Sequence, residues 1–186
     1  MERMCMARFE NKVAVVTGAG RGIGLEIARA FAAEGGKVAV VSRSPGSCGS
    51  AAEAINAEFP DSAKSYAVDV ADHEAVQTLA KEIVADFGSI NILVNNAGVT
   101  RDGLLMRMKD EDWDTVLDTN LKGAFNTVKA FQRSMMKADD PRIINISSVI
   151  GLMGNAGQVN YAASKAGLIG SAASACSMAS SASERE

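Results

Sequence analysis

Apolar residues along the chain alternate between short, nearly continuous runs and longer segments where they recur at helical spacing. The short runs predict strands at 12–18, 37–43, 64–70, 90–98 and 142–148. The periodic segments predict helices at 22–35, 49–59, 72–88, 110–137 and 157–170. The strands are rich in Val and Ile and look apolar on both faces, which predicts a parallel sheet covered by helices.

This order of elements predicts one α/β domain with a Rossmann-like, doubly wound parallel sheet. Strand–helix–strand units give right-handed crossovers, and the ligands of such a sheet lie at the carboxyl ends of its strands. Asp72 is the predicted N-cap of the helix that follows it, and Gly88 the predicted C-terminal stop of that helix. The chemistry is therefore expected where the strands end.

The stretch TGAGRGIG, from Thr17 to Gly24, follows the first strand and opens the first helix. Its glycines are spaced Gly-x-x-x-Gly-x-Gly, which allows a tight turn and a close approach of backbone to a phosphate. The helix N-terminus adds free N–H groups and a partial positive charge. A simple glycine turn is the alternative for this motif alone. Together with the motifs below, it predicts nucleotide binding.

The end of the second strand bears on which nucleotide is bound. NAD-specific sites usually place an acid there to hold the ribose 2′-hydroxyl, but this strand ends in Val41, Ser42, Arg43 and Ser44. Arg43 and Arg21 are placed to reach a 2′-phosphate through charge-assisted hydrogen bonds, which favours NADP. The alternative is that both arginines are solvated surface residues.

Two further strand ends carry polar groups. Asp69 ends the predicted third strand, where its carboxylate either accepts from an adenine amino group or caps the next turn. The segment NNAG, from Asn95 to Gly98, ends the fourth strand. Its small residues would let backbone lie against a flat ring, and its amides can tie loops together. A plain turn is the alternative for NNAG.

Tyr161 and Lys165 lie four residues apart, so a helix places them on one face. A phenol ordinarily titrates near pKa 10, and an ammonium a few ångströms away favours its ionised form. Such a tyrosine can protonate a carbonyl oxygen as hydride reaches the carbon. Ser148, at the end of the fifth strand, is a candidate to hold that oxygen, and Asn120 a candidate to fix a relay water. In isolation, a surface Tyr–Lys pair is the commoner explanation.

These motifs together resemble the short-chain dehydrogenase/reductase family. The stretches NNAGVTRDGLLMRMKDEDW and GLMGNAGQVNYAASKAGLIG are most similar to its 3-oxoacyl-acyl-carrier-protein reductases of fatty-acid biosynthesis. The resemblance implies NADPH-dependent reduction of a 3-oxoacyl thioester by four catalytic residues, Asn120, Ser148, Tyr161 and Lys165. It also implies cofactor contacts from Gly18, Ala19, Gly20, Arg21, Gly22, Ile23, Gly24, Arg43, Asp69, Val70, Asn96, Ala97, Gly98, Tyr161 and Lys165. The alternatives are a family member acting on a sugar, steroid or small ketone, and a non-catalytic nucleotide-binding fragment.

The last 16 residues depart from the family pattern. Ala and Ser make up 11 of the residues from 171 to 186, and the only large apolar residue after Ile169 is Met178. We therefore predict an incomplete reductase domain at 1–170, lacking the last strands of the family, and a divergent tail at 171–186 from a truncated or frameshifted reading frame. The fifth strand would then be an exposed apolar edge, and the family's homo-oligomer is in doubt.

Composition narrows the function classes. The net charge of −3 argues against a nucleic-acid partner, and no apolar run is long enough for a membrane span. The cysteines Cys5, Cys48 and Cys176 are scattered, which favours a reducing, cytoplasmic setting. No cluster of His, Cys and carboxylate residues indicates a metal.

Two features bear on the substrate and its carrier. The stretch KADDPR before the fifth strand carries Asp139 and Asp140 where the resemblance implies basic residues that dock an acidic carrier protein. The prediction that acyl carrier protein docks on this chain is therefore less secure than the prediction of the active site. A group of apolar residues either lines an acyl pocket or packs in the core: Leu104, Leu105, Met106, Met108 and Trp113.

Overall fold

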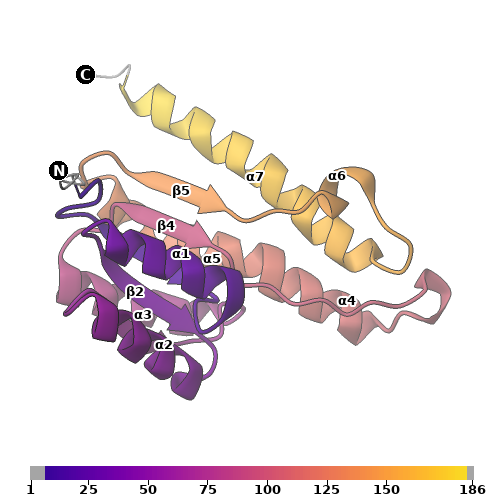
Figure 1. Cartoon of the computed structure of the whole chain (residues 1–186). Helices are drawn as coiled ribbons and strands as arrows, with labels where there is room; N and C mark the ends of the chain where they lie inside the picture. Colours follow the sequence, from indigo (N-terminus) through magenta and orange to yellow (C-terminus); the bar gives the residue numbers. More distant parts are fainter. Residues whose placement is uncertain (1–6, 184–186) are drawn as a thin grey trace, which may run out of the picture.

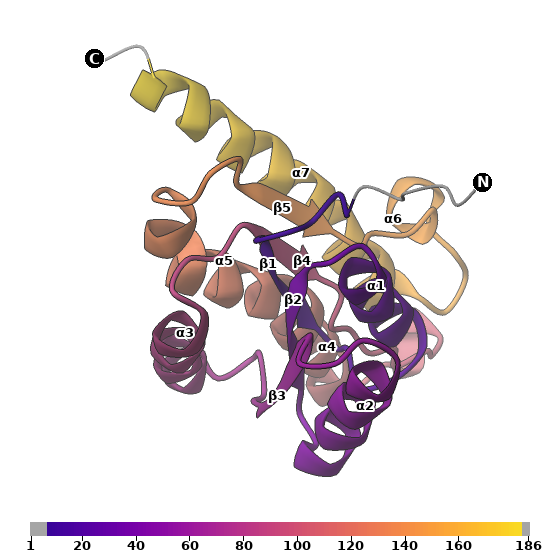
Figure 2. The ribbon, with the colours of Figure 1, turned by 60° about the vertical axis from the view of Figure 1, so that its left-hand side comes forward.

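The computed structural model describes residues 7–183, with side chains described as far as residue 171. Its five strands form one parallel sheet in the order β3-β2-β1-β4-β5 (Figure 2). The strands are β1 (Val13–Thr17), β2 (Lys37–Ser42), β3 (Ala63–Ala67), β4 (Ile92–Asn95) and β5 (Arg142–Asn145). The predicted doubly wound parallel sheet is confirmed. Cys5 and the side chains of Cys176 and Met178 lie outside the described residues.

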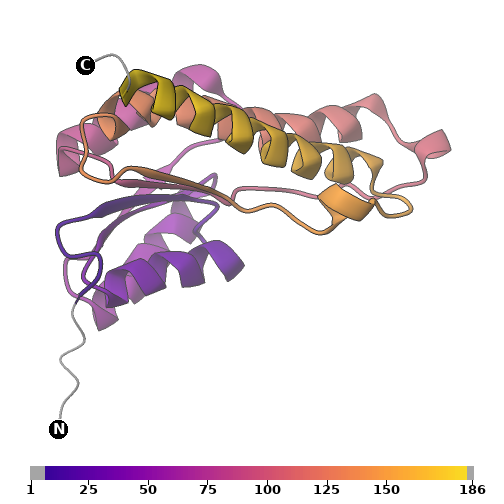
Figure 3. The ribbon, with the colours of Figure 1, turned by 90° about the horizontal axis from the view of Figure 1, so that it is seen from above.

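Helices cover both faces of the sheet (Figures 1 and 3). On one face lie α1 (Gly22–Ala33) and α2 (Pro45–Glu58). On the other face lie α3 (His73–Phe87), α5 (Gly123–Met135) and α7 (Val159–Ser183). The shorter elements are η1 (Leu105–Arg107), α4 (Asp110–Leu117), the π-helical η2 (Asp118–Lys122) and α6 (Ile150–Met153).

The central strands are buried on both faces, as predicted. Alternate residues of β1 enter two separate cores: Val13 and Val15 pack with α3 and α5, whereas Ala14 and Val16 pack with α1 and α2. The prediction is wrong for β3 and β5, because each lies at an edge of the sheet. Ile143 and Ile144 of β5 are each 41% exposed.

Three predicted helices differ from the structure by more than two residues at one end, or in their continuity. The helix predicted at 110–137 is α4, η2 and α5 in succession, ending at Met135. The helix predicted from Gly49 begins at Pro45, because proline is tolerated in a first turn, where its missing N–H has no helical partner. The helix predicted to end at 170 continues to Ser183, so the proposed boundary between domain and tail falls inside α7.

The helix caps follow the sequence. Asp72 accepts a 3.0 Å hydrogen bond from the N–H of Ala75 and is the N-cap of α3, as predicted. Gly88 has φ +83° and ends that helix, also as predicted. Within residues 7–183, no helix is long and apolar enough to cross a bilayer.

Candidate nucleotide-binding and catalytic site

A cavity of about 660 Å³ lies beyond the carboxyl ends of β1, β2, β3 and β4. It sits where the strand order reverses, because β1 has β2 on one side and β4 on the other. Most predicted cofactor residues line it: Gly18, Gly20, Arg21, Gly22, Ile23, Gly24, Arg43, Asp69, Val70, Asn96, Ala97 and Gly98. Sequence reasoning did not assign the remaining lining residues, which are Val41, Ser42, Ser44, Ser47, Val68, Val99 and Thr119. Ala19, Tyr161 and Lys165 were predicted contacts, but they do not line this cavity.

The glycines let two loops approach each other closely. Gly18 has φ +66°, and a Cβ there would lie 2.8 Å from Cα of Ala97. A Cβ on Gly24 would lie 2.5 Å from the carbonyl oxygen of Gly18 and 2.4 Å from Nδ2 of Asn96. Glycine is thus required where the loop after β1 packs against the loop after β4.

Thr17 and Asn96 lock these two loops together. Oγ1 of Thr17 accepts from the N–H groups of Asn96 and Ala97, each at 3.1 Å. Nδ2 of Asn96 donates to the carbonyl oxygens of Thr17 at 2.9 Å and Gly18 at 3.3 Å. The prediction that the amides of NNAG tie loops together is confirmed for Asn96.

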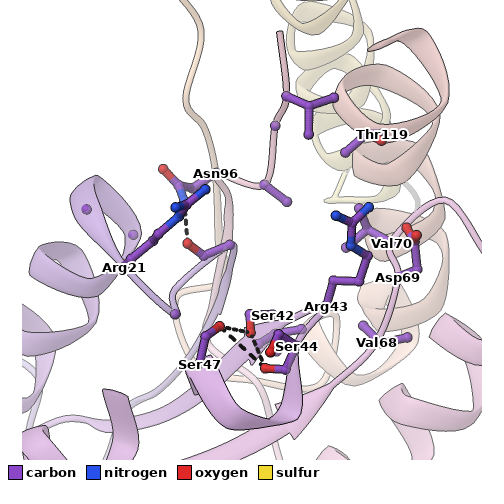
Figure 4. A pocket seen from close by; sticks show the side chains of 18 of the residues that line it. Arg21, Ser42, Arg43, Ser44, Ser47, Val68, Asp69, Val70, Asn96 and Thr119 are labelled. Atoms are coloured by element: carbon purple, nitrogen blue, oxygen red, sulfur yellow. Dashed lines mark hydrogen bonds between the residues drawn. The ribbon is translucent and has the colours of Figure 1, made fainter. Parts of the chain in front are cut away.

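The two arginines stand on opposite sides of the cavity (Figure 4). Arg21 is the N-cap residue of α1, and Arg43 directly follows β2. Both are exposed, and among the described residues neither forms an ion pair. Their guanidinium groups are therefore available to an anionic ligand.

Serines form the floor below Arg43. Oγ of Ser42 lies 2.9 Å from Oγ of Ser47, and it donates to the carbonyl oxygen of Ser44 at 3.0 Å (Figure 4). Ser47 belongs to the first turn of α2, which the sequence prediction left outside the helix. Its contribution to the site was missed for that reason.

Asp69 lies two residues beyond the end of β3 at Ala67, so the prediction that it ends the strand is wrong. Its Oδ1 accepts a 3.0 Å hydrogen bond from the N–H of Ala71, which is the turn-capping arrangement. Asp69 also lines the cavity, so the residue caps this turn and borders the site at the same time. Val70, the next residue, packs on Gly123, where a Cβ would lie 2.6 Å from Cγ2 of Val70.

Tyr161 and Lys165 lie one turn apart on α7. Nζ of Lys165 is 5.7 Å from the centre of the Tyr161 ring. Lys165 is only 4% exposed, and its Nζ donates to the carbonyl oxygen of Ile146 at 2.7 Å. Burial lowers the pKa of Lys165 below the ordinary value of a lysine.

Asn120 lies in the π-helical turn η2 and is 1% exposed. Its side-chain amide bonds both polar groups of Val99: Oδ1 accepts from the N–H at 2.7 Å, and Nδ2 donates to the carbonyl oxygen at 3.0 Å. A Cβ on Gly98 would lie 3.2 Å from Oδ1 of Asn120 and 3.7 Å from Nζ of Lys165. The side chains of Asn120 and Lys165 therefore both lie close to Gly98, which lines the cavity.

Ser148 lies three residues beyond the end of β5 at Asn145, so the prediction that it ends the strand is wrong. Its Oγ accepts a 3.2 Å hydrogen bond from the N–H of Ile150. The neighbouring Ser147, which sequence reasoning missed, donates from Oγ to the carbonyl oxygen of Lys165 at 2.9 Å. This segment is thereby fastened to the helix that carries Tyr161.

Two segments with exposed apolar residues, one around η1 and the other in α6, lie beside α7. Leu104, Leu105 and Met106 are 57%, 70% and 85% exposed, so core packing does not describe these three residues. Leu152 and Met153 of α6 are 75% and 83% exposed. The N–H of Gly103 donates to the carbonyl oxygen of Gly157 at 2.8 Å, which joins the first segment to the start of α7. Across the described residues, no group of three or more His, Cys, Asp and Glu side chains is arranged to hold a metal.

The chain is similar to known proteins in sequence and in structure. It is 50% identical over 162 residues to the 3-oxoacyl-[acyl-carrier-protein] reductase FabG of Escherichia coli strain K12. It is also 50% identical over 161 residues to the FabG of Staphylococcus aureus strain Mu50. These alignments cover 87% and 86% of this chain, but the chain spans only 65% of the length of each relative.

A solved structure of NAD⁺-bound xylitol dehydrogenase matches with a TM-score of 0.84 and 35% identity, covering 88% of this chain and 63% of that one. The sequence model of the family described as short chain dehydrogenase matches residues 12–182. This match takes in nearly the whole chain, including the glycine loop, Asn120, Ser148 and the Tyr161–Lys165 pair. The chain therefore belongs to the short-chain dehydrogenase family.

Proposed function

We propose that this chain derives from an NADPH-dependent reductase that converts a 3-oxoacyl thioester, carried on acyl carrier protein, to its 3-hydroxyacyl form. The observation that carries the proposal is the position of Lys165, which lies near the Tyr161 ring and, with Asn120, close to Gly98 at the border of a glycine-lined cavity. This cavity lies at the switch point of the sheet. The substrate class is supported by the two FabG relatives at 50% identity.

The residues around the cavity fit a dinucleotide phosphate. The glycine loop leaves room for backbone to approach a pyrophosphate, and the N-terminus of α1 favours negative charge there. Arg21 and Arg43, which form no ion pair within residues 7–183, supply guanidinium groups suited to a 2′-phosphate. The xylitol dehydrogenase was solved with NAD⁺, so the choice of NADPH for this chain rests on these two arginines and on the relatives.

In the proposed reaction, the carbonyl carbon of the substrate would receive a hydride from bound NADPH, held by the glycine loop, Arg21 and Arg43. The Tyr161 hydroxyl gives its proton to the carbonyl oxygen, which completes the 3-hydroxy product. The charged form of Lys165 stabilises the resulting phenolate, and Ser148 donates its O–H to the oxygen as negative charge develops there. Burial lowers the pKa of Lys165, and the negative charge of the phenolate acts in the opposite direction, because it favours the ammonium form.

Asn120 contributes to the relay through its main chain in this proposal. Both N–H bonds of its side-chain amide are used, by Val99 and by Ser164, and Oδ1 already accepts from Val99. A water that replenishes the Tyr161 proton by way of Lys165 would therefore be held by the main-chain carbonyl of Asn120. The amide's task is to fix the turn that presents this carbonyl.

The exposed apolar residues of the η1 segment and of α6 suit an acyl chain. Leu104, Leu105 and Met106 in one segment, and Leu152 and Met153 in the other, offer exposed apolar surface beside α7. The carrier protein would meet a mixed surface, because Asp139 pairs with Lys12 at 2.6 Å and Asp140 with Arg142 at 2.5 Å. The structure thus offers more support for an acyl thioester as substrate than for the docking of its carrier protein.

The test compares the two tyrosines of the chain. Tyr161→Phe should lower the rate of NADPH oxidation with a 3-oxoacyl thioester by about 10²- to 10⁴-fold, the usual contribution of a general acid, while NADPH binding persists. Tyr66→Phe is the control, because Tyr66 bonds Asp86 on the opposite edge of the sheet. If wild type reduces small ketones but no acyl thioester, the substrate proposal is wrong. Binding without any turnover would favour a nucleotide-binding fragment.

A further inference from the structure

One buried hydroxyl beside the catalytic pair takes no part in the proposed chemistry. Ser164 precedes Lys165 on α7 and is 0% exposed. Its Oγ lies 2.8 Å from the carbonyl oxygen of Tyr161 and 3.1 Å from Nδ2 of Asn120. The hydroxyl therefore stands between two residues to which the proposed reaction assigns roles.

The chemistry of the partners fixes the direction of both hydrogen bonds. A carbonyl oxygen only accepts, so the hydroxyl of Ser164 donates this hydrogen bond to the main-chain carbonyl oxygen of Tyr161. An amide nitrogen only donates, so Ser164 accepts from Nδ2 of Asn120. The hydroxyl is thereby held in a single orientation, as an acceptor facing Asn120.

This acceptor completes the hydrogen bonding of the Asn120 amide. Val99 uses Oδ1 and one N–H of that amide, and Ser164 takes the other N–H. A flipped amide would face Oδ1 against the carbonyl oxygen of Val99 and an N–H against its N–H, which are two repulsive contacts. The three bonds join segments that are 21 and 44 residues apart in the sequence.

We propose that Ser164 is a positioning residue that holds the π turn bearing Asn120 in register with the helix bearing Tyr161 and Lys165. This inference rests on the proposed function for its catalytic consequence. Without the hydroxyl, one N–H of Asn120 is buried with no partner, and the turn is free to shift away from Lys165. Misplacement on the ångström scale costs an enzyme up to about 100-fold in rate.

The helix offers a matched control. Ser171, also on α7, donates to the carbonyl oxygen of Leu168 at 2.9 Å, which repeats the bond from Ser164 to the carbonyl three residues earlier. Ser171 is exposed and accepts no described bond from another segment. Ser171→Ala thus removes the local helix bond alone, whereas Ser164→Ala removes that bond and the acceptor for Asn120.

The experiment records the side-chain amide signals of asparagine-labelled full chain by NMR, with Asn120→Asp identifying the Asn120 pair. Ser164→Ala should shift this pair and speed its hydrogen exchange, whereas Ser171→Ala should leave it unchanged. In turnover, Ser164→Ala should lower kcat by about 10- to 100-fold with KM for NADPH unchanged. If Ser164→Ala fails to fold, Ser164→Cys places a weaker acceptor at the same position and should shift the same signals from their wild-type values.

An Asn120 signal that is unchanged in Ser164→Ala would overturn the inference, as would equal changes in both serine variants. If wild type reduces no thioester, the proposed function fails, yet the NMR comparison still decides whether Ser164 positions Asn120. A loss of thermal stability alone, with kcat per folded molecule intact, would also contradict a positioning role.

Discussion

At the scale of single residues, the site depends on where a side chain is absent as much as on where one is present. Gly24 touches the carbonyl of Gly18 and the amide of Asn96, so it cannot accept a Cβ without moving backbone. Gly49, in the middle of α2, has nothing within 4 Å of its would-be Cβ. The glycine motif predicted a close approach at Gly24, whereas no motif surrounds Gly49, and the structure shows the difference in what packs against each.

Gly24→Ala should therefore lower the free energy of unfolding by about 1–3 kcal/mol, the usual cost of overpacking, and weaken NADPH binding. Gly49→Ala should raise it by about 0.5–1 kcal/mol, because alanine is the better helix former. Chemical denaturation measures both changes. Equal effects of the two substitutions would show that the close approach at Gly24 is not what selects glycine.

The predicted preference for NADPH over NADH can be tested at Arg43. Charge-assisted hydrogen bonds contribute about 1.5–3 kcal/mol, so Arg43→Ala should weaken NADPH binding by about 10- to 100-fold. NADH, which lacks the 2′-phosphate, should bind as before. Arg133→Ala, which removes an exposed arginine from α5, is the charge control. An equal loss of NADH affinity would mean that Arg43 supports the fold of the pocket instead of the phosphate.

At the scale of elements, periodicity predicted the existence and order of the strands and most helices, whereas the ends of elements were harder. Ser148 and Asp69 were assigned to strand ends, but both lie in loops, because apolar runs do not show where pairing with a neighbour stops. The π turn η2 was not foreseen either. Its extra residue interrupts no apolar pattern, and π turns often occur at functional sites.

The exposed edge strand β5 makes a prediction about solubility. Ile144 is 41% exposed on a strand with no neighbour on its outer side within the described residues, and such apolar edges favour association. Ile144→Lys should reduce concentration-dependent aggregation, measured by light scattering, because the lysine stem can lie along the sheet with its charge in water. Ile92→Lys, in the buried strand β4, should instead unfold the protein. Unchanged aggregation of Ile144→Lys would exclude β5 as the surface through which the chains associate.

The contact between β3 and α3 makes a prediction about acid stability. Asp86 bonds Lys64 at 2.7 Å and Tyr66 at 2.5 Å, and these contacts lower the pKa of its carboxyl, the one from Lys64 most. A lowered carboxyl pKa stabilises the fold above the unfolded-state pKa of about 3.9, and this stabilisation is lost as pH falls through the folded-state value.

The difference in unfolding free energy between wild type and Asp86→Asn should therefore shrink as pH is lowered from about 5 to about 2. Denaturant titrations at several pH values measure it. Asp114→Asn, at an exposed position of α4 with no described ion pair, should show no such trend. A constant difference for Asp86→Asn would mean that the carboxylate's charge contributes nothing to stability.

At the scale of the whole molecule, the sequence predicted the sheet. It also predicted, as cofactor contacts, most of the residues that the structure places around one cavity. It did not foresee the supporting contacts of Ser147, Ser164 and Thr17, because single serines and threonines carry no spacing signal. The chain spans 65% of the length of its FabG relatives, and β5 is an edge strand of the described sheet.

The most direct test of the central claim is the binding of NADPH to the 186-residue chain, followed by nicotinamide fluorescence with NADH as the comparison. We predict saturable binding that is at least about ten-fold tighter for NADPH, through the phosphate contacts of Arg21 and Arg43. Equal affinity for both nucleotides would contradict the assignment of the arginines. Absence of binding by a folded, monomeric sample would contradict the nucleotide site itself.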